Sequence, residues 1–348
     1  MIWLTWRQFR VQAITAVATL AAFAVLLAVT GPHLASLYAA SGITGCHGGS
    51  CGQLASSFLS LVGVGIYPVV YMLGIAGIVL APAVIGIFWG APLIAREFEA
   101  GTCRLAWTQS ITRTRWLAVK LTLTGLAAMA VTEALSLIQA WWAAPIGQAA
   151  RLATRSTFPL GMGPLSPLAF DAHGITPLGY AAFAFTLGVT TGVLLRRAIP
   201  AMALTLVIFA AVQVAMPLWI RPHLFPPGHT TAAISSFTAL PTQIGPNGTF
   251  AFGVQFLPSQ PGAWILSAGA VNAAGQPVST NPAACRSLAL SGSPAWTQCL
   301  TSHGIRIGVT YQPTSRYWAI QGTETAIYLA LAVALARYCF WRLSRRLS

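Results

Sequence analysis

"VQAITAVATLAAFAVLLAVT", residues 11–30, is an apolar run of 20 residues without a charged side chain. Such a run crosses the hydrocarbon core of a bilayer as a helix, because a span needs about 20 mostly apolar residues. It follows Arg7 and Arg10, as a secretory signal would. The apolar region of a signal peptide has only about 7–15 residues, however, so we interpret this run as an uncleaved membrane anchor.

The rest of the chain has the same apolar character. Hydrophobic residues make up 56% and charged residues 7% of the 348 residues, and the mean hydropathy is +0.70. Soluble proteins carry roughly 25% charged residues, so this chain cannot cover a water-facing surface. Five more spans are expected within 60–90 and at about 116–140, 176–195, 198–219 and 323–341. The sequence therefore predicts an all-α integral membrane protein with six transmembrane helices.

The basic residues predict the orientation of these spans. A net charge of +14 would suggest nucleic acid in a soluble protein, but membrane proteins use Arg and Lys to set their orientation, so no nucleic-acid partner is expected. Six spans place both termini on one side, which then holds 13 basic residues against six on the other. The 13 are Arg7, Arg10, five within 96–120, Arg196, Arg197, Arg337, Arg342, Arg345 and Arg346. We expect a multi-pass protein of the cell (plasma) membrane with both termini in the cytoplasm.

Residues 220–322 form the largest segment outside the spans. They are rich in Pro, Gly, Ser, Thr and Asn and contain short alternating runs such as "TFAFGVQF" at 249–256 and "GIRIGVTY" at 304–311. This pattern predicts a small, partly β, extracytoplasmic insertion between the fifth and sixth spans. The expected organisation is therefore five spans in 1–219, the insertion in 220–322, and the sixth span with a basic tail in 323–348.

Four of the six cysteines form two local pairs on the predicted outer side. Disulfides persist in oxidising compartments, so we expect Cys46–Cys51 and Cys285–Cys299 bonds, whereas Cys103 and Cys339 lie on the inner side without a local partner. Metal binding by Cys46, His47 and Cys51, or by "HLFPPGH" at 223–229, is the alternative. No zinc-ligand spacing is repeated, and we expect no metal site.

One charged segment interrupts the apolar sequence. Residues 96–120, "REFEAGTCRLAWTQSITRTRWLAVK", hold seven of the 24 charged side chains, including the only lysine. Basic residues alone would serve as an orientation signal, but Glu97 and Glu99 add nothing to orientation, which indicates a docking surface. Gly101 and Thr102 predict a helix end followed by a new N-cap, and Thr112 is the predicted N-cap of the third span.

This segment carries a resemblance to a known family. Residues 88–120, "FWGAPLIAREFEAGTCRLAWTQSITRTRWLAVK", resemble ABC transporter permeases of the type-2 exporter class, in particular a subgroup common in actinobacteria. "TWRQFR" at 5–10 and "SRYWAIQGTETAIYLALAVALA" at 315–336 resemble that subgroup too. The resemblance implies export by a homodimer or heterodimer of permeases. It also implies that a coupling segment at about 91–115 docks on a separate cytoplasmic ATPase subunit. The implied contact residues are Arg96, Glu97, Glu99, Gly101, Thr102 and Arg104.

The chain itself lacks the residues for ATP hydrolysis. A phosphate-binding loop needs glycines before its Lys and Ser/Thr, and the only lysine, Lys120, lies in "LAVKLTL". We therefore expect no enzyme activity and no cofactor here, with ATP and Mg²⁺ on the partner subunit. The alternatives are a non-transporting membrane sensor or immunity protein, or a secondary carrier that uses Glu133. Glu133 lies well inside the third span, where an ionisable group lines a substrate path or forms a structural hydrogen bond, for example to Gln213. The substrate stays open among drugs, antibiotics, lipids and peptides.

Overall fold

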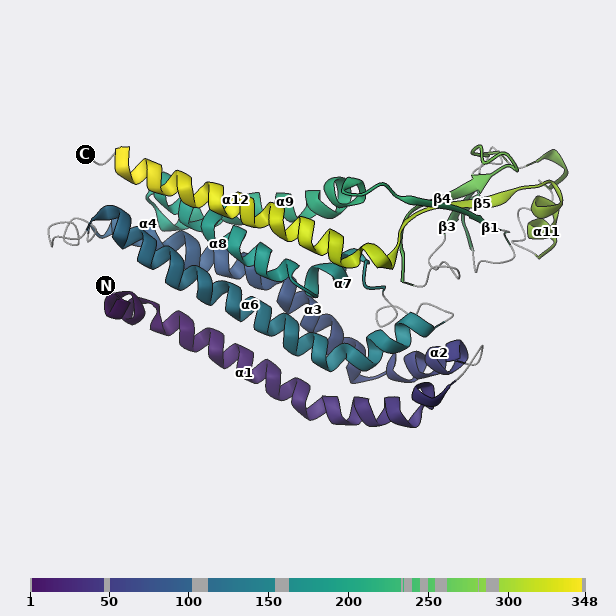
Figure 1. Cartoon of the computed structure of the whole chain (residues 1–348), viewed down its shortest axis with the longest axis horizontal. Helices are drawn as coiled ribbons and strands as arrows, with labels where there is room; N and C mark the ends of the chain where they lie inside the picture. The colour runs from purple at the N-terminus through teal and green to yellow at the C-terminus, as the bar shows by residue number, and fades with distance from the viewer. Residues whose placement is uncertain are drawn as a thin grey trace.

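A bundle of long helices carries a small β region at one end (Figure 1). The computed structural model describes residues 2–46, 51–101, 112–153, 163–232, 234, 240–244, 250–253, 262–280, 282–285 and 294–345. Six helical segments among them are long and apolar enough to cross a membrane, as the sequence predicts. They are Phe9–Ala40, Ile66–Glu99, Thr114–Leu152, Thr176–Leu195, Ala198–His223 and Thr314–Ser344.

Seven α-helices build these segments. They are α1 (Ile2–Ala40), α3 (Ile66–Ile85), α4 (Ala91–Glu99), α6 (Arg113–Leu152), α8 (Thr176–Leu195), α9 (Ala198–Ala215) and α12 (Tyr317–Arg345). A π-helical turn, η3 (Gly86–Gly90), joins α3 to α4, and a second one, η4 (Met216–Ile220), extends α9 into the turn η5 (Arg221–His223). The connections contain η1 (Ile43–Gly45), α2 (Cys51–Val62) and α7 (Pro167–Ala172).

Three of the helices are longer than the predicted spans. α1 continues to Ala40, α6 continues to Leu152, and α12 begins at Tyr317 rather than at 323. Gln321 lowers the hydropathy just before position 323, so hydropathy alone does not indicate that the helix begins earlier, while Glu324 lies inside the predicted span. Both side chains are fully buried within α12.

The two ends of the bundle differ in what they carry. Both termini lie at one end, which we call the terminal end, and the β region lies at the other, which we call the domain end (Figure 1). Phe9, Trp116 and Leu343 share one buried apolar cluster, so α1, α6 and α12 meet near the termini. This arrangement agrees with an even number of spans.

α8 is the central helix of the bundle. In its membrane-spanning window 78% of the residues are buried, against 6% in α1, which therefore lies at the edge. Glycines bring α8 into backbone contact with η3 and α4: a Cβ at Gly188 would lie 2.2 Å from the Gly86 oxygen, and one at Gly192 would lie 2.6 Å from the Ala91 oxygen. Gly86 and Gly90 on one helix and Gly188 and Gly192 on the other form two G-x-x-x-G pairs, the spacing that permits such close packing in membranes.

α1 is attached to its neighbours by apolar packing and by polar contacts, which include a hydrogen bond between His33 and Tyr67 of α3. Trp142 of α6 donates its indole N–H to the Thr30 hydroxyl at 2.9 Å, and Gln12 donates to the Phe88 carbonyl oxygen at 3.0 Å. The contacts lie toward opposite ends of α1, so the helix is fixed along its length although most of its surface is exposed.

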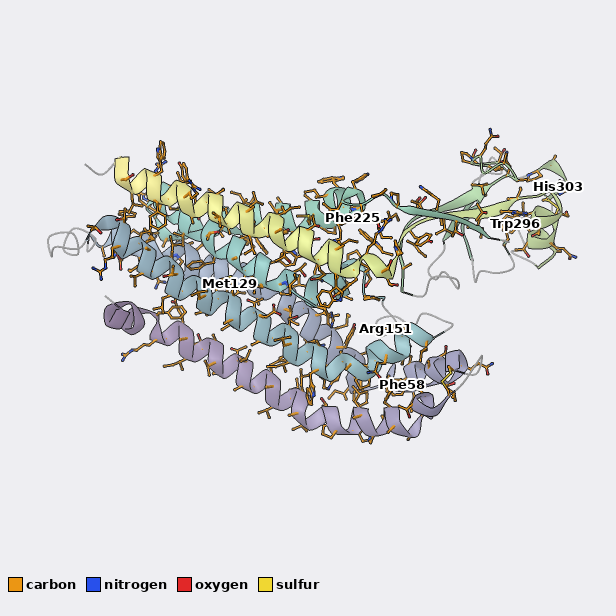
Figure 2. The ribbon with its side chains drawn as sticks, in the orientation of Figure 1. Phe58, Met129, Arg151, Phe225, Trp296 and His303 are labelled. Atoms are coloured by element: carbon orange, nitrogen blue, oxygen red, sulfur yellow. A yellow bond between two sulfur atoms is a disulfide. The ribbon has the colours of Figure 1, made fainter. Side chains whose placement is uncertain are left out.

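The domain end contains the β structure that the alternating runs predict. β1 (Gly228–Ala232), β5 (Arg306–Gln312) and β4 (Trp264–Val271) form an antiparallel sheet in that order, and β2 (Leu240–Ile244) pairs with β3 (Phe250–Gly253). The helix α11 (Pro294–Ser302) covers the sheet and contributes Trp296, which is fully buried in the core of the domain (Figure 2).

Both expected cysteine pairs are disulfide-bonded in the structure. The Cα atoms are 5.5 Å apart in Cys46–Cys51 and 5.8 Å apart in Cys285–Cys299, which are ordinary separations. Cys339 is a buried free thiol, and Cys103 lies outside the described residues. His303 lies close to Cys285 and Cys299, but the bond between their sulfurs leaves only the imidazole as a metal ligand.

Candidate functional site

The charged segment at the terminal end begins as the sequence predicts. α4 ends at Glu99, and Gly101 follows with φ 69°, a conformation that glycine adopts without steric cost. Thr112 caps α6, its hydroxyl oxygen accepting the Arg115 backbone N–H at 3.4 Å. Two of the predicted contact residues, Thr102 and Arg104, lie outside the described residues.

Glu97 connects α4 to α6. It forms an ion pair with Lys120, and the two side chains are only 16% and 4% exposed. The Lys120 ammonium also lies 5.0 Å from the centre of the Trp116 ring, a cation–π contact. Removing one partner of a buried pair leaves an uncompensated charge, so the two residues depend on each other.

Glu99 and Phe98 connect α4 to the turn between α8 and α9. Glu99 Oε1 accepts the Ala198 backbone N–H at 3.0 Å, which supplies an acceptor and a negative charge at the N-terminus of α9. The Arg196 guanidinium lies 5.7 Å from the centre of the Phe98 ring. The predicted docking residues Glu97 and Glu99 thus have partners within the chain. Glu99 is nevertheless exposed, as is Arg96 on the same helix.

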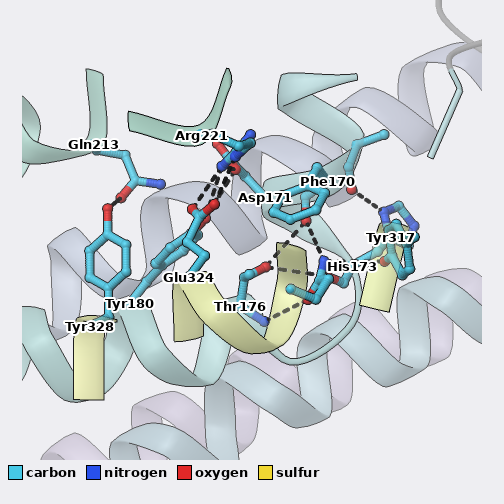
Figure 3. A network of polar contacts seen from close by, with 12 residues as sticks. Phe170, Asp171, His173, Thr176, Tyr180, Gln213, Arg221, Tyr317, Glu324 and Tyr328 are labelled. Carbon is cyan, nitrogen blue, oxygen red and sulfur yellow. Dashed lines mark hydrogen bonds and ion pairs between the residues drawn. The ribbon is translucent and has the colours of Figure 1, made fainter. Parts of the chain in front are cut away.

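A second polar site lies buried at the domain end and is centred on Arg221 of η5 (Figure 3). The guanidinium is fully buried and binds Glu324 of α12 in bidentate fashion, with Nε at 2.7 Å from Oε2 and Nη2 at 2.8 Å from Oε1. Nη2 also forms an ion pair with Asp171 of α7. The face of the guanidinium lies 4.2 Å from the centre of the Phe170 ring. Planar bidentate geometry of this kind is specific to arginine.

Tyr180 of α8 completes this network. Its hydroxyl group lies 2.6 Å from Glu324 Oε1 and 3.0 Å from Asp171 Oδ1, and it can donate its single hydrogen to either. One guanidinium faces two carboxylates, so the cluster carries one excess negative charge when both are ionised. Burial raises the pKa of Asp171, against the opposing attraction of Arg221. The network joins α7, α8, η5 and α12, and so fixes the last three spans to one another.

Gln321 extends the polar contacts by one turn of α12. Its Oε1 accepts the backbone N–H groups of Ile175 at 3.0 Å and Thr176 at 3.1 Å, at the start of α8, and its Nε2 donates to the His173 carbonyl oxygen at 2.9 Å. Gln321 is therefore a cap of α8 supplied by another helix.

Glu133 of α6 does not form a hydrogen bond to Gln213, the example given for its structural alternative. Gln213 instead accepts a long hydrogen bond of 3.5 Å from Tyr328. Among the described residues Glu133 Oε2 is buried without a hydrogen-bond partner, and so are both polar atoms of Gln139, further along α6. Buried unpaired polar groups are rare in native proteins and call for an explanation.

A family comparison agrees with this architecture. The sequence profile described as ABC-2 membrane transporter related matches residues 17–221, more than half of the chain. The chain belongs to this family. The match begins in α1 and ends at Arg221, so it covers the first five spans but neither the β region nor α12. No curated protein and no solved structure matches the chain.

The ABC-2 family identifies the chain as a multi-pass membrane protein of the permease type, for which an ATPase subunit is the general partner. The sequence singled out the charged segment at the terminal end but did not predict the Arg221 network. Its two carboxylates, Asp171 and Glu324, lie 50 and 103 residues from Arg221 along the chain. One signal was available: Asp171 is the only aspartate, and Glu324 lies within an apolar helix. Ionisable groups in such positions are expected to be paired.

Proposed function

We propose that this chain is the transmembrane permease subunit of an ATP-driven exporter, of the subgroup that residues 88–120 resemble. It forms the substrate pathway as a dimer and couples to a separate ATPase that binds ATP and Mg²⁺. The observation that carries the proposal is the family match across five spans. In this proposal the terminal end faces the cytoplasm and the domain end lies outside the cell membrane.

The contacts of α4 suggest how the ATPase moves the bundle. Glu97 is bonded to Lys120 of α6, and Glu99 to the first turn of α9, so a displacement of α4 acts on two further spans directly. We assign the direct ATPase contact to the exposed Arg96 and to the Gly101 turn with the neighbouring Thr102 and Arg104, and the transmission of force to Glu97 and Glu99. Charges at such a contact set partner choice more than affinity.

A charge-swap experiment separates these two roles. Glu97→Lys places two cations together and should abolish stimulation of the co-expressed ATPase in vesicles. Glu97→Lys combined with Lys120→Glu restores the pair within the chain, and should recover most of the activity. A double variant that inserts normally but stays inactive would assign Glu97 to the partner surface instead.

Arg96→Glu is the matched control on the exposed face of the same helix. It should weaken co-purification of the ATPase without lowering the thermal stability of the permease, because its side chain is exposed. ATPase binding that Arg96→Glu leaves undiminished would contradict the assignment of the contact to this face of α4. An unchanged chain that binds no ATPase at all would contradict the permease proposal and favour a non-transporting sensor or immunity protein.

The second candidate is a secondary carrier that uses Glu133. The observation that favours it is the buried Glu133 Oε2 without a hydrogen-bond partner among the described residues. A carrier would transport without an ATPase, so uptake or efflux by the permease alone in proteoliposomes, driven by a pH gradient, distinguishes it from the exporter.

A further inference from the structure

A cavity of about 560 Å³ lies where the bundle meets the β region. One wall is the connector that follows α9, residues 217–227, and the other is the first half of β4 with Thr310 of β5. Phe225 lies at this junction between bundle and domain (Figure 2). The volume falls within the range of roughly 300–1,000 Å³ that is usual for small-molecule sites.

The connector wall is rigid and hydrogen-bonded. Pro222, Pro226 and Pro227 restrict its backbone, since the proline ring fixes φ. The fully buried Gln312 donates to the Phe225 carbonyl oxygen at 2.7 Å, and Arg316 donates to that of Pro226. A wall held in this way exists before a ligand arrives, which lowers the entropic cost of binding.

The cavity is also connected to the buried network. Phe225 and Trp264 pack on the apolar cluster that contains Phe170, and Phe170 supports the Arg221 guanidinium. Occupancy of the cavity would therefore act on the residues that fix the last three spans to one another.

The lining selects the class of ligand. Among the described residues it contains Trp264, Phe225, four prolines and aliphatic side chains, and no Asp, Glu, Lys or Arg. Its hydrogen-bonding side chains are His223, Trp264, Ser267 and Thr310. The ring nitrogen Nδ1 of His223 is bonded to the Trp219 carbonyl oxygen at 2.8 Å. Such a surface favours flat apolar rings with one or two hydrogen-bonding groups, and it offers no countercharge to an ion.

The surface beside the cavity indicates the route of arrival. Leu218 lines the cavity and is 59% exposed, and the neighbouring Trp219 is 68% exposed. Both lie in the last turns of the fifth span, where tryptophan marks the level of the lipid headgroups. The cavity therefore borders the bilayer interface, where lipophilic molecules accumulate.

We infer that this cavity binds neutral, ring-bearing lipophilic molecules that come from the bilayer interface at the domain end. The inference deepens the proposed function by naming the class of substrate. Binding to the cavity itself requires no ATPase, so the two proposals can fail separately.

The test is photolabelling of the full chain in nanodiscs with a neutral probe, trifluoromethyl-diazirinyl benzyl alcohol. Labelling at residues 264–267 and 222–227 should saturate, and excess unreactive benzyl-alcohol analogue should suppress it. Ser267→Trp, which fills the cavity from its exposed rim, should weaken this labelling about tenfold, a loss of about 1.4 kcal/mol of binding free energy. The carboxylate form of the probe should not label the site.

Two controls sharpen the result. Ser302→Trp makes the same change on the exposed surface of α11 and should leave cavity labelling unchanged. Trp318 is 66% exposed on α12 and reports unspecific labelling, which should not saturate. Unsaturable labelling at 264–267, or labelling that Ser267→Trp leaves intact, would overturn the inference. If the ATPase still co-purifies in that case, the exporter proposal remains valid. Saturable labelling without any ATPase association would support the binding site and contradict the exporter proposal.

Discussion

At the scale of single residues, Arg221 is a buried charge whose stability depends on two carboxylates. It is fully buried between Glu324 and Asp171, and its removal leaves two buried carboxyl groups without a cation. Breaking a buried ion pair by deleting one partner costs about 3–5 kcal/mol. We predict that Arg221→Met lowers the free energy of unfolding of the detergent-solubilised protein by about this amount, and with it the melting temperature. The measurement is a melting curve followed by loss of monodisperse protein.

Two further variants test the cause of this loss. Arg306→Met removes an exposed arginine from β5 and should change little. Arg221→Met combined with Asp171→Asn and Glu324→Gln removes the charges together, and should regain much of the stability. A triple variant that melts no later than Arg221→Met would show that packing on Phe170, rather than charge, is what Arg221 supplies.

Glu133 behaves differently at the same scale. Because Glu133 Oε2 has no hydrogen-bond partner among the described residues, Glu133→Gln removes a charge without breaking a described bond. We predict unchanged or higher thermal stability, together with altered transport rate or substrate preference. Glu324→Gln is the contrasting variant and should destabilise, since Glu324 accepts from Arg221 and Tyr180. A destabilised Glu133→Gln protein with unaltered selectivity would instead assign Glu133 a structural role.

At the scale of elements, glycine contacts decide how the second span crosses α8. A Cβ at Gly188 would lie 2.2 Å from the Gly86 oxygen and 2.8 Å from the Ala91 nitrogen, so the helices must move apart to accept one. We predict that Gly188→Ala destabilises the bundle by about 1–3 kcal/mol, the usual cost of overpacking. Gly77→Ala, in α3, is the matched control because nothing lies within 4 Å of its added Cβ. Equal melting temperatures of the two variants would contradict the close crossing.

The elements also show what the sequence can and cannot predict. Hydropathy alone found all six spans, because crossing a bilayer imposes a length and a composition on each helix separately. Hydropathy did not predict that α12 begins at Tyr317, because Gln321 is polar and its buried partners lie in the connection between α7 and α8. The caps at Gly101 and Thr112 were predictable from local chemistry. The partners of Glu97 and Glu99 were not, since both lie on other helices.

At the scale of the whole molecule, a group of exposed arginines and the disulfide of the β region lie at opposite ends. The terminal end carries the exposed Arg10, Arg96 and Arg115 together with the Arg196–Arg197 turn. The Cys285–Cys299 bond lies in the β region at the opposite end. Cytoplasmic connections are enriched in basic residues, and disulfides persist in oxidising compartments. Each rule, applied separately, favours the proposed orientation, with the terminal end in the cytoplasm.

Cysteine labelling in intact cells tests this orientation. In a Cys103→Ser background, Ser302→Cys on α11 should react with a membrane-impermeant maleimide added outside. Thr114→Cys at the start of α6 should react only after the membrane is permeabilised. Both positions are exposed, so a lack of reaction reports the barrier of the membrane and not burial in the protein. Reaction of Thr114→Cys in intact cells would show that the bundle has the opposite orientation in the membrane. It would also place the Arg96 surface where no cytoplasmic ATPase can reach it, so this single result bears on the orientation and on the exporter together.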